Sequence, residues 1–529
     1  MPRSSPQLLP DHLAQGATNT KLWSGALDKF NDPAFYYDPS KAGNLKTIYR
    51  FGAVPGNDLS GFWFHWTQEV HCVRGPVKGD TQERTYFTGD GVPQSTDASI
   101  ATAGGTDYPT NSYDLGVPSP PAGLSVAVSG ASGAPEDATN RAYAVTYVSA
   151  LGEEGPPSPL TGEVQFWEGQ TVTLTLIPLG PGGNLNIGTK RIYRTATGAS
   201  TELDFVVELP VSDSSYIDVV LDSQLGESIQ SVFWEAPPSD MVGIGAMANG
   251  LMYGFSKNLV CVSEAWLPHA WNPLNQQATN HPIIAGGHFD NTIVALTTKN
   301  PYLITGYDPR SLTMQEYDIG QGCVSARSAV NSKYGVAYAS PDGLMLVGPG
   351  GYKNLTDPFM TKDQWQELTP ESILGVVHED RYFGFYDNGA TQGCFLLDPN
   401  NLDVGLVYLD IYATGAFSDP MTDKLYLLVN NQIMIWDEGV AAAYLWKSKV
   451  FRTGRNSLTA CRILADTYTD LVFRLYINGV IHHTETVTSD RPFRMPGGAD
   501  SILYEFDLVG TDVVNQVALT STPSELAFV

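Results

Sequence analysis

The segment NGLMYGF at residues 249–255 is the first of five similar segments that decide the fold of this 529-residue chain. In each segment a turn precedes a short apolar strand, and the separations between successive anchor residues are 42, 43, 46 and 43 residues. A near-constant period of this length is typical of propeller blades, because one small sheet needs its neighbours to complete a core. We therefore predict β-propeller repeats of about 43 residues over residues 236–445, with a chance series of β-hairpins as the alternative. The anchors are Leu251, Ile293, Val336, Tyr382 and Leu425.

Composition predicts an all-β protein with several domains. The chain has 42% hydrophobic and 11% aromatic residues, enough to bury sizeable cores. Only 16% of its residues are charged, whereas about a quarter are charged in typical soluble chains. Its 52 glycines and 35 prolines, together with 26 tyrosines, favour many strands joined by many turns. At this length about two to four domains are expected.

Two regions precede the main body. Residues 1–45 are polar and rich in turns, and we expect them to form an extended arm lying on other structure. Residues 46–118 form a block of closely spaced strands that is expected to contribute to the propeller. Within that block, GFWFHWTQEV at residues 61–70 places aromatic side chains on both faces of one strand. Both faces of this strand are therefore expected to be covered.

Residues 119–235 are expected to form an inserted β-sandwich, because short alternating strands there are separated by turns every eight to fifteen residues. The segment RAYAVTYVSALGEEGPPSP at residues 141–159 resembles a strand and turn of a fibronectin-type-III module. Residues 446–529 are expected to form a C-terminal β-domain, with Asn478 and Gly479 as the two-residue turn of a hairpin.

The net charge is −26, from 56 acidic and 30 basic residues. Such a balance argues against general affinity for nucleic acid through phosphate contacts. Solubility is a sufficient explanation for the excess of acidic residues. The alternative is that several copies surround a channel whose wall repels a passing DNA duplex.

The cysteines are sparse and isolated, and none forms a CxxC pair, which argues against a disulfide framework or a zinc site. We expect them to be small buried apolar residues in a chain folded in a reducing cytoplasm. The N-terminal residues lack the apolar region of a signal peptide, and no run of apolar residues is long enough to span a membrane. The five are Cys72, Cys261, Cys323, Cys394 and Cys461.

The common catalytic and cofactor motifs are absent from the sequence: there is no phosphate-binding loop, HExxH, GxSxG or EF-hand loop. GIGAMANG at residues 243–250 is expected to be a turn leading into a strand. The sequence HED at residues 378–380 is expected to be a polar blade turn. His482 and His483 point to opposite faces of one strand, so they cannot both bind one metal ion. We expect no enzymatic activity, no cofactor and no metal site.

One stretch, residues 447–462, carries five basic residues and no acidic residue. It is interpreted either as a solvated edge strand protected by lysines or as a contact surface. In the second interpretation it touches DNA, an adaptor protein or an acidic neighbouring subunit. The basic residues are Lys447, Lys449, Arg452, Arg455 and Arg462.

Several segments together resemble tail proteins of short-tailed bacteriophages (podoviruses). They include LLPDHLAQGATNTKLWSGAL at residues 8–27, GFWFHWTQEVHCVRG at residues 61–75 and WKSKVFRTG at residues 446–454. The group is the tail nozzle or hub, similar to tail tubular protein B and to packaged-DNA stabilisation proteins. The resemblance covers residues 1–100 and 245–529. It is a resemblance of segments and their order, and no functional residue is carried over from the family.

The resemblance implies a homohexameric ring of propeller-based subunits in the virion tail, below the portal and adaptor proteins. Such a ring retains packaged double-stranded DNA, conducts it during ejection without sequence-specific binding, and offers attachment surfaces for tail fibres or spikes. The chain would be made and assembled in the host cytoplasm. The family plan does not require the inserted sandwich, whose partner stays open.

Two further classes of function are alternatives. A carbohydrate-binding or depolymerising tail component would bind host polysaccharide in an acidic cleft. A tail fibre or baseplate scaffold would be trimeric rather than hexameric. In the nozzle interpretation, the channel-facing surface is expected to be negative, and residues 447–462 are expected to lie at a contact between subunits or with the adaptor.

Overall fold

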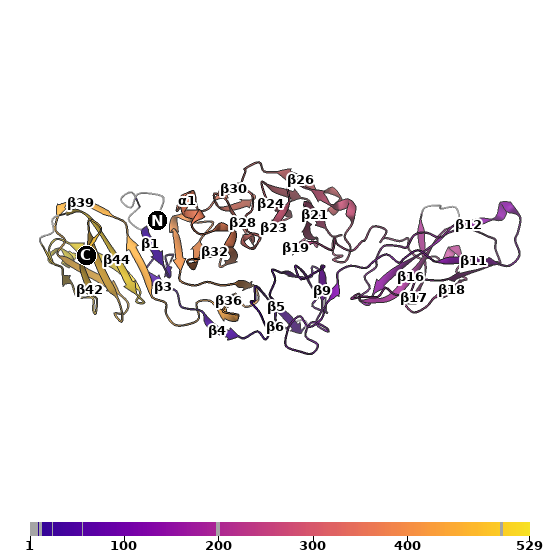
Figure 1. Ribbon diagram of the computed structural model, residues 1–529, viewed down its shortest axis with the longest axis horizontal. Helices are drawn as coiled ribbons and strands as arrows, with labels where there is room; N and C mark the ends of the chain where they lie inside the picture. The colour runs from indigo at the N-terminus through magenta and orange to yellow at the C-terminus, as the bar shows by residue number, and fades with distance from the viewer. Residues whose placement is uncertain are drawn as a thin grey trace.

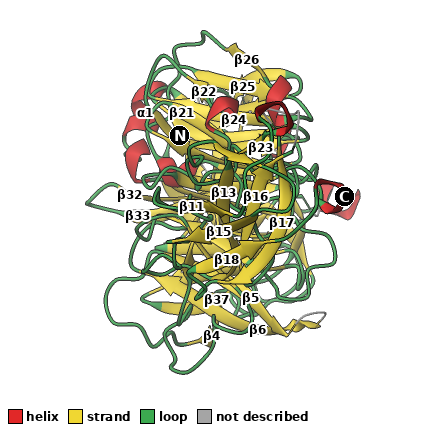
Figure 2. Ribbon diagram, turned by 90° about the vertical axis from the view of Figure 1, so that its right-hand side faces the viewer, coloured by secondary structure: helices red, strands yellow, loops and turns green. Residues whose placement is uncertain are grey.

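The computed structural model describes residues 9, 13–23, 25–54, 57–196, 202–497 and 501–528. Three β-rich parts follow one another along the long axis, with the C-terminal domain at one end, a ring of small sheets in the middle and the inserted module at the other end (Figure 1). The all-β prediction is confirmed, because helix is confined to a few short segments (Figure 2). These are α1 (Lys362–Gln366) and the 3-10 turns Pro135–Asp137, Asp222–Gln224, Pro273–Asn275, Pro309–Ser311, Ala326–Ser328, Pro370–Ser372, Leu402–Val404 and Glu525–Phe528.

The central ring consists, within the described residues, of six four-stranded antiparallel blades and one two-stranded hairpin; five of the blades are separate sheets, and the other is part of a larger sheet. Numbered around the ring, blade 1 is β7 (His71–Arg74), β8 (Thr85–Thr88), β9 (Gln94–Thr96) and β10 (Tyr113–Asp114). Blade 2 is β19 (Val242–Ala246), β20 (Met252–Ser256), β21 (Leu259–Val262) and β22 (Gln277–Ala278). Blade 3 is β23 (Ile283–Phe289), β24 (Thr292–Thr297), β25 (Pro301–Thr305) and β26 (Thr313–Glu316).

The other blades complete the ring. Blade 4 is β27 (Val330–Ser332), β28 (Gly335–Ser340), β29 (Gly343–Gly348) and β30 (Gly351–Asn354). Blade 5 is β31 (Leu374–His378), β32 (Arg381–Asp387), β33 (Gln392–Leu397) and β34 (Leu406–Leu409). Blade 6 is β35 (Gly415–Asp419), β36 (Lys424–Val429) and β37 (Gln432–Ile435), with β4 (Ala34–Tyr37) as its outer strand. Blade 7 is the hairpin of β5 (Thr47–Val54) and β6 (Asn57–Trp66).

Apolar clusters between neighbouring blades close this ring into a propeller. Tyr253 of blade 2 and Ile304 of blade 3 belong to one such cluster, and comparable clusters join blades 3 to 4, 4 to 5 and 5 to 6. Blade 7 contacts blade 6 through Trp63 and blade 1 through Phe64, and a further cluster joins blade 1 to blade 2. Each small sheet therefore buries both faces against its neighbours, as the repeat requires.

The five anchor residues of the predicted repeat recur at equivalent places in successive blades. The five anchors, at most 1% exposed, lie in the second strands of blades 2 to 6, except that Leu251 directly precedes β20. The aromatic strand β6 is also covered on both faces as predicted, since Trp63 is 4% exposed and Phe64 and His65 are fully buried. The five anchor residues set the period because each packs in a cluster shared with a neighbouring blade.

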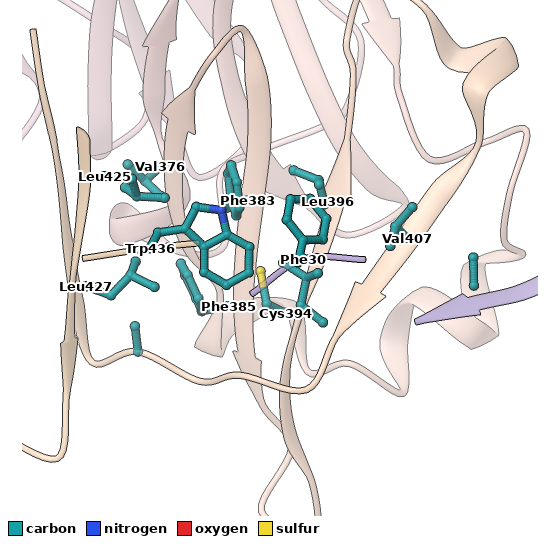
Figure 3. Packing of buried hydrophobic residues seen from close by; sticks show 13 residues of the cluster. Phe30, Val376, Phe383, Phe385, Cys394, Leu396, Val407, Leu425, Leu427 and Trp436 are labelled. Atoms are coloured by element: carbon teal, nitrogen blue, oxygen red, sulfur yellow. The ribbon is translucent and has the colours of Figure 1, made fainter. Parts of the chain in front are cut away.

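Figure 3 shows the cluster between blades 5 and 6, where Phe30 of the N-terminal segment lies near Trp436 and Cys394. The ring centroids of Phe30 and Trp436 are 5.1 Å apart, and the ring of Phe383 in β32 also contacts the tryptophan, at 5.8 Å between centroids. The N-terminal segment thus supplies a side chain to a core formed by residues some 400 positions later in the chain.

The N-terminal segment also contributes strands to distant sheets. Strand β1 (Ala14–Thr18) pairs in parallel with β34 of blade 5 and antiparallel with β38 of the C-terminal domain. It therefore joins a propeller blade and the C-terminal domain into one continuous sheet. Two short strands, β2 (Thr20–Lys21) and β3 (Asp28–Lys29), form a separate hairpin between β1 and β4.

The C-terminal domain is a β-sandwich. One of its sheets contains β38 (Tyr444–Ser448), β39 (Phe451–Asn456), β41 (Val472–Ile477), β42 (Val480–Thr486) and β44 (Ser501–Gly510). The other contains β40 (Ala460–Ala465), β43 (Phe493–Arg494) and β45 (Val514–Thr520). The predicted hairpin turn is confirmed, because Asn478 and Gly479 join β41 to β42 with φ of 53° and 80°. Positive φ at both positions is what a type I′ turn requires.

The inserted module is a second sandwich, as predicted. Its sheets are β11 (Ser125–Ser129), β15 (Thr171–Thr175) and β18 (Ser215–Asp218); β13 (Tyr143–Ser149), β16 (Ile187–Thr195) and β17 (Leu203–Pro210); and the pair β12 (Thr139–Arg141) and β14 (Val164–Phe166). Buried Tyr143, Leu174 and Ile192 form part of the core between the two larger sheets. The likeness to a fibronectin-type-III module stays a prediction.

Candidate interaction surfaces

The predicted basic stretch begins at Lys447 in β38, and its side chain is engaged within the domain. Its Nζ lies 3.3 Å from Oε2 of Glu505 in β44 and 4.6 Å from the ring centroid of Tyr476. Strand β38 lies between β1 and β44, so the interpretation as an edge strand protected by lysines is wrong for this strand. The sequence could not reveal this, because one partner strand comes from the N-terminus.

Glu505 connects Lys447 to the N-terminal strand. Its carboxylate is largely buried and also accepts a hydrogen bond of 2.6 Å from Nε2 of Gln15 in β1. Gln15 donates a second bond, of 2.8 Å, to the backbone carbonyl of Ser448. A buried carboxylate is stabilised when it is both paired with a cation and hydrogen-bonded. Lys447 therefore balances an internal charge at the junction of β1, β38 and β44.

The other residues of the stretch are divided between two sheets. The ammonium group of Lys449 lies 5.6 Å from the ring centroid of Phe451, and Arg452 is exposed on β39. Arg462 lies on β40 in the opposite sheet, where its Nε donates to the backbone carbonyl of Asp490 at 3.2 Å. The side chain of Arg455 lies outside the described residues. The structure thus places Lys447 and Arg452 on one sheet, Lys449 in the connection between β38 and β39, and Arg462 on the other sheet, and a role for the stretch in contacts stays a prediction.

The two segments examined for catalytic or cofactor motifs, residues 378–380 and 243–250, form turns and strands of the propeller. Glu379 and Asp380 form the turn between β31 and β32 with φ of 47° and 65°, as predicted for a blade turn. Nδ1 of His378 lies 3.1 Å from the hydroxyl of Ser418 on the next blade. GIGAMANG forms β19 and the turn leading to β20. Among the described residues, no three histidine, cysteine or carboxylate side chains are grouped so that they could hold a metal ion.

All five cysteines are free, and four of them are buried. Burial raises the pKa of the Cys261 and Cys323 thiols to about 12 each. A thiol with a raised pKa remains protonated at neutral pH and is a poor nucleophile or metal ligand. These side chains therefore act as small apolar residues, whereas Cys72 is only partly buried.

A cavity of about 460 Å³ lies between the inserted module and blade 2; we call it the junction cavity. The module supplies Arg191 and Tyr193 of β16, and the segment that returns the chain to the propeller supplies Glu227 and Trp234. His269 lies on the propeller side of the cavity, in the loop after β21. No motif in the sequence indicated this site, because its walls come from five separate segments.

Polar groups on the module side of the junction cavity form a closed network around Glu154. Its carboxylate accepts hydrogen bonds from the Tyr193 hydroxyl at 2.8 Å, from the Thr146 hydroxyl at 2.6 Å and from Nη1 of Arg191 at 2.8 Å. Nε of Arg191 donates to Glu208 at 2.8 Å, and this bond lowers the pKa of the Glu208 carboxyl. Arg191, the cation that lines the cavity, is therefore occupied by two carboxylates.

His269 differs from the other polar groups of the junction cavity. Its residue is 3% exposed, and neither ring nitrogen has a hydrogen-bond partner among the described residues. The Glu153 carboxylate is 4.0 Å from Nδ1, beyond hydrogen-bond distance, and the edge of the ring faces Trp234 at 5.9 Å between centroids. Burial lowers the pKa of His269 to about 4, with the backbone of Glu154 opposing the shift. The imidazole is therefore neutral at pH 7.

The inserted module buries three of its four cations, Arg141, Lys190 and Arg194. Residues 119–235 contain 14 acidic and 4 basic residues. The Arg194 guanidinium is fully buried against Asp218 and Asp222, and the Lys190 ammonium donates to backbone carbonyls, including that of Pro178 at 2.9 Å. Arg141 also pairs with Asp222, at 3.3 Å. Arg191 is paired with Glu154 and Glu208. The charge that the module presents to solvent is therefore mainly that of carboxylates.

Comparison with known proteins gives no family for this chain. No family model matches it, and no curated protein matches it. Solved structures that resemble it include AztD of Citrobacter koseri (11% identity, 69% of this chain and 100% of that chain, TM-score 0.26) and the AfRom2 CNH domain (7% identity, 50% and 88%, TM-score 0.26). The N-terminal domain of Nup159 is similar at 10% identity over 60% of this chain and 86% of that chain, with a TM-score of 0.25. Likenesses at this level carry no inference about function.

The described part of the chain contains no helix that is long and apolar enough to cross a membrane.

Proposed function

We propose that this chain is a structural subunit of a phage tail nozzle or hub. In this proposal six copies form a ring around a channel that retains packaged DNA and conducts it during ejection. The ring also offers surfaces to portal and adaptor proteins and to tail fibres or spikes. The resemblance of the terminal and propeller segments to podoviral tail proteins is the starting point.

The observation that carries the proposal is the placement of charge. The chain has a net charge of −26, and the inserted module turns its few cations inward against its own carboxylates and backbone carbonyls. Lys447, from the most basic stretch of the chain, is likewise balanced internally by Glu505. A wall that presents carboxylates repels a phosphate backbone, which favours passage over binding.

The architecture also supports a wall-forming role. Strand β1 joins blade 5 to the C-terminal sheet, so the propeller and the C-terminal domain share a hydrogen-bonded sheet rather than a flexible linker. The buried thiols and the absence of a grouped metal-binding set among the described residues offer no support for catalysis. An internally braced subunit is suited to a ring that retains packaged DNA.

Native mass spectrometry and electron cryomicroscopy of the purified full-length chain test this proposal. The expected result is a six-fold ring with an axial hole as wide as a DNA duplex and a lining of carboxylates. The same particles should show little affinity for duplex DNA at physiological salt. A positively charged lining, or tight salt-sensitive DNA binding, would overturn the proposal that the channel conducts DNA without binding it.

Two other outcomes would replace the proposal. A trimer without an axial hole would identify a fibre or baseplate scaffold. Release of soluble sugar from host cells incubated with the protein would identify a depolymerising component. The second assay needs a heat-denatured sample of the same protein as its control, so that sugar shed by the cells alone is subtracted.

A further inference from the structure

The imidazole of His288 joins three blades of the propeller. His288 lies in β23, the first strand of blade 3, and its Nδ1 is 3.1 Å from the Tyr253 hydroxyl of blade 2 and 3.1 Å from Nδ2 of Asn331 in blade 4. The rings of His288 and Tyr253 also lie edge to face, with 5.6 Å between their centroids. Three separate sheets therefore meet at one ring nitrogen.

A second hydrogen bond fixes the orientation of the Asn331 amide. Its Oδ1 accepts a bond of 3.0 Å from the backbone N–H of His288. Because only the oxygen of the amide can accept that bond, Nδ2 is the atom that faces the imidazole. The amide NH2 group is a donor and never an acceptor, so Nδ1 of His288 is an acceptor that carries no proton. The neutral imidazole therefore carries its proton on Nε2.

A proton on Nδ1 is incompatible with this arrangement. The new N–H would point at the Asn331 NH2 group, so that two donors face each other. Turning the amide over would bring its oxygen to Nδ1, but its NH2 group would then face the backbone N–H of His288. The Tyr253 hydroxyl, in contrast, can rotate and accept a bond from the protonated ring. Protonation therefore breaks the contact with blade 4 and leaves that with blade 2.

The surroundings of His288 favour its neutral form. The titratable group that faces it is the buried Tyr253 hydroxyl, and burial raises the pKa of that hydroxyl far above neutrality. Of the charged residues on adjoining segments, Asp290 is exposed in the turn after β23, Lys333 is paired with a carboxylate of blade 5, and Arg327 donates to backbone carbonyls elsewhere. Burial lowers the pKa of His288, and no charged neighbour among the described residues offsets this shift.

The contact between blades 5 and 6 is built differently. There Nδ1 of His378 meets the Ser418 hydroxyl at 3.1 Å, and a hydroxyl can either donate or accept a hydrogen bond. Glu379 and Asp423 also favour the charged form of His378, although burial lowers its pKa more than they raise it. Protonation of His378 therefore leaves its contact in place, and the two contacts should respond differently to acid.

We propose that the contact between His288 and Asn331 is a pH switch, which joins blade 4 to blade 3 while the imidazole is neutral and releases blade 4 when Nδ1 is protonated. The contact is complete above about pH 6.5, where histidine in an unfolded chain is neutral, and is lost as the pH falls through the lower pKa of His288 in the folded chain. His288 is only partly buried and Asn331 is exposed, so protons reach the contact from solvent. This inference does not depend on the proposed role in a phage tail.

Nuclear magnetic resonance of the full-length chain, labelled with nitrogen-15 in its histidine rings, tests the switch. The ring-nitrogen chemical shifts report which nitrogen carries the proton, and their change with pH gives the pKa. The His288 signals are identified by their loss in the His288→Asn variant. The expected result for the unmodified chain is a proton on Nε2 at pH 7.5 and a pKa below 6.5.

Asn331→Asp is the decisive variant, because Asn331 is exposed and a carboxylate has nearly the shape of the amide. The carboxylate still accepts the backbone N–H of His288, and it places a negative charge beside Nδ1. It is expected to raise the pKa of His288 by about one to three pH units. Asn291→Asp is the matched control: it adds the same charge in the turn between β23 and β24, outside the partners of Nδ1. Its effect on that pKa should be a small fraction of the effect of Asn331→Asp.

Amide hydrogen exchange measures the contact between the blades, with each rate divided by that of an unstructured peptide at the same pH. As the pH falls from 7.5 to 5, protection of β27 and of the His288 amide should fall about fivefold, as loss of one hydrogen bond implies. Protection should stay constant in His288→Asn, whose side chain does not titrate. Strands β31 and β35, on either side of the His378 contact, should keep their protection in both proteins.

Three results would overturn the inference. They are a proton on Nδ1 of His288 at pH 7.5, equal effects of Asn331→Asp and Asn291→Asp on the pKa of His288, and protection of β27 that falls equally in the unmodified chain and in His288→Asn. If Asn331→Asp does not fold, the comparison with His288→Asn decides the question alone.

Discussion

The Arg50 guanidinium of blade 7 lies 3.1 Å from the Asp419 carboxylate of blade 6, and the two side chains are only 8% and 3% exposed. This ion pair joins the two-stranded hairpin, contributed early in the chain, to the last blade of the repeat. Asp419 is also held by the Thr422 hydroxyl at 2.7 Å. A buried ion pair whose carboxylate is also hydrogen-bonded by a neighbouring side chain fixes the geometry at which the ring closes.

Replacing Asp419 by Asn should destabilise the propeller strongly, because the buried Arg50 guanidinium would lose the negative charge of the Asp419 carboxylate. Breaking one side of a buried ion pair typically costs about 3–5 kcal/mol. The measurement is urea unfolding followed by tryptophan fluorescence. Asp423→Asn is the control, since Asp423 is exposed in the turn of the same blade and should change stability by no more than about 0.5 kcal/mol. Equal effects of the two substitutions would show that the pair does not hold the ring closed.

Strand β1 makes a second long-range connection, and a proline at Ala17 should break it. Ala17 is 3% exposed and pairs with Trp446 in β38, while its neighbour Thr18 pairs with Tyr408 in β34. A proline in a central strand removes a donor and leaves a buried acceptor unsatisfied, which costs about 1–3 kcal/mol. Amide hydrogen exchange in β34 and β38 is expected to quicken together.

Gly16→Ala is the control for that experiment. An added methyl group at Gly16 would meet no atom within 4 Å, and the backbone donor is retained. Exchange in β34 and β38 should then match that of the unmodified chain. If Ala17→Pro quickens exchange in only one of the two strands, β1 does not couple the propeller to the C-terminal domain.

The sequence was sufficient for features that are local or periodic. Ile293, Val336 and Tyr382 could be placed correctly because each recurs at the same point of a repeat, and repetition separates a core position from a chance apolar residue. The turn at Asn478 and Gly479 could be predicted because its backbone conformation is encoded by the two residues themselves.

Features that depend on distant partners could not be predicted. Residues 14–18 are polar and small, and nothing in them shows that they lie between strands about 390 and 430 positions away. The status of Lys447 depends on Glu505 and Gln15, so its charge could not be recognised as internally balanced from the basic stretch alone. The junction cavity likewise joins Arg191 to His269 across two domains.

The turn between β41 and β42 allows a clean test of backbone strain. Gly479 has φ of 80°, and an added Cβ would meet no atom within 4 Å, so Gly479→Ala changes only the conformational energy. A non-glycine residue in this region costs about 1–2 kcal/mol. Gly497→Ala is the control, because that glycine lies in the same domain, has no positive φ, and an added Cβ would meet only the Thr459 methyl group, at 3.5 Å. The C-terminal domain should lose stability in thermal unfolding only with Gly479→Ala, and equal shifts would argue against the type I′ turn.

The neutral, buried His269 predicts that the junction weakens in acid. Its pKa in the folded chain is about 4, below the usual value of 6.5, so the unfolded chain binds more protons between these values. Stability from this residue is therefore complete above about pH 6.5 and is lost as the pH falls toward 4. A shift of this size corresponds to up to about 3 kcal/mol.

Other charged groups lie near His269, and their contributions to the pH dependence must be distinguished from that of His269. Arg84 pairs with Glu153 at 3.2 Å, and burial raises the pKa of the Glu153 carboxyl, which gives a pH dependence of opposite sign. The quantity to measure is therefore the difference in unfolding free energy between the unmodified chain and His269→Phe, at several values from pH 7.5 to pH 4.5. A constant offset from the change of side chain cancels in the slope. As the pH falls, the unfolding free energy of the unmodified chain should decrease relative to that of His269→Phe. A difference that does not change with pH would mean that His269 is not the neutral buried group described above.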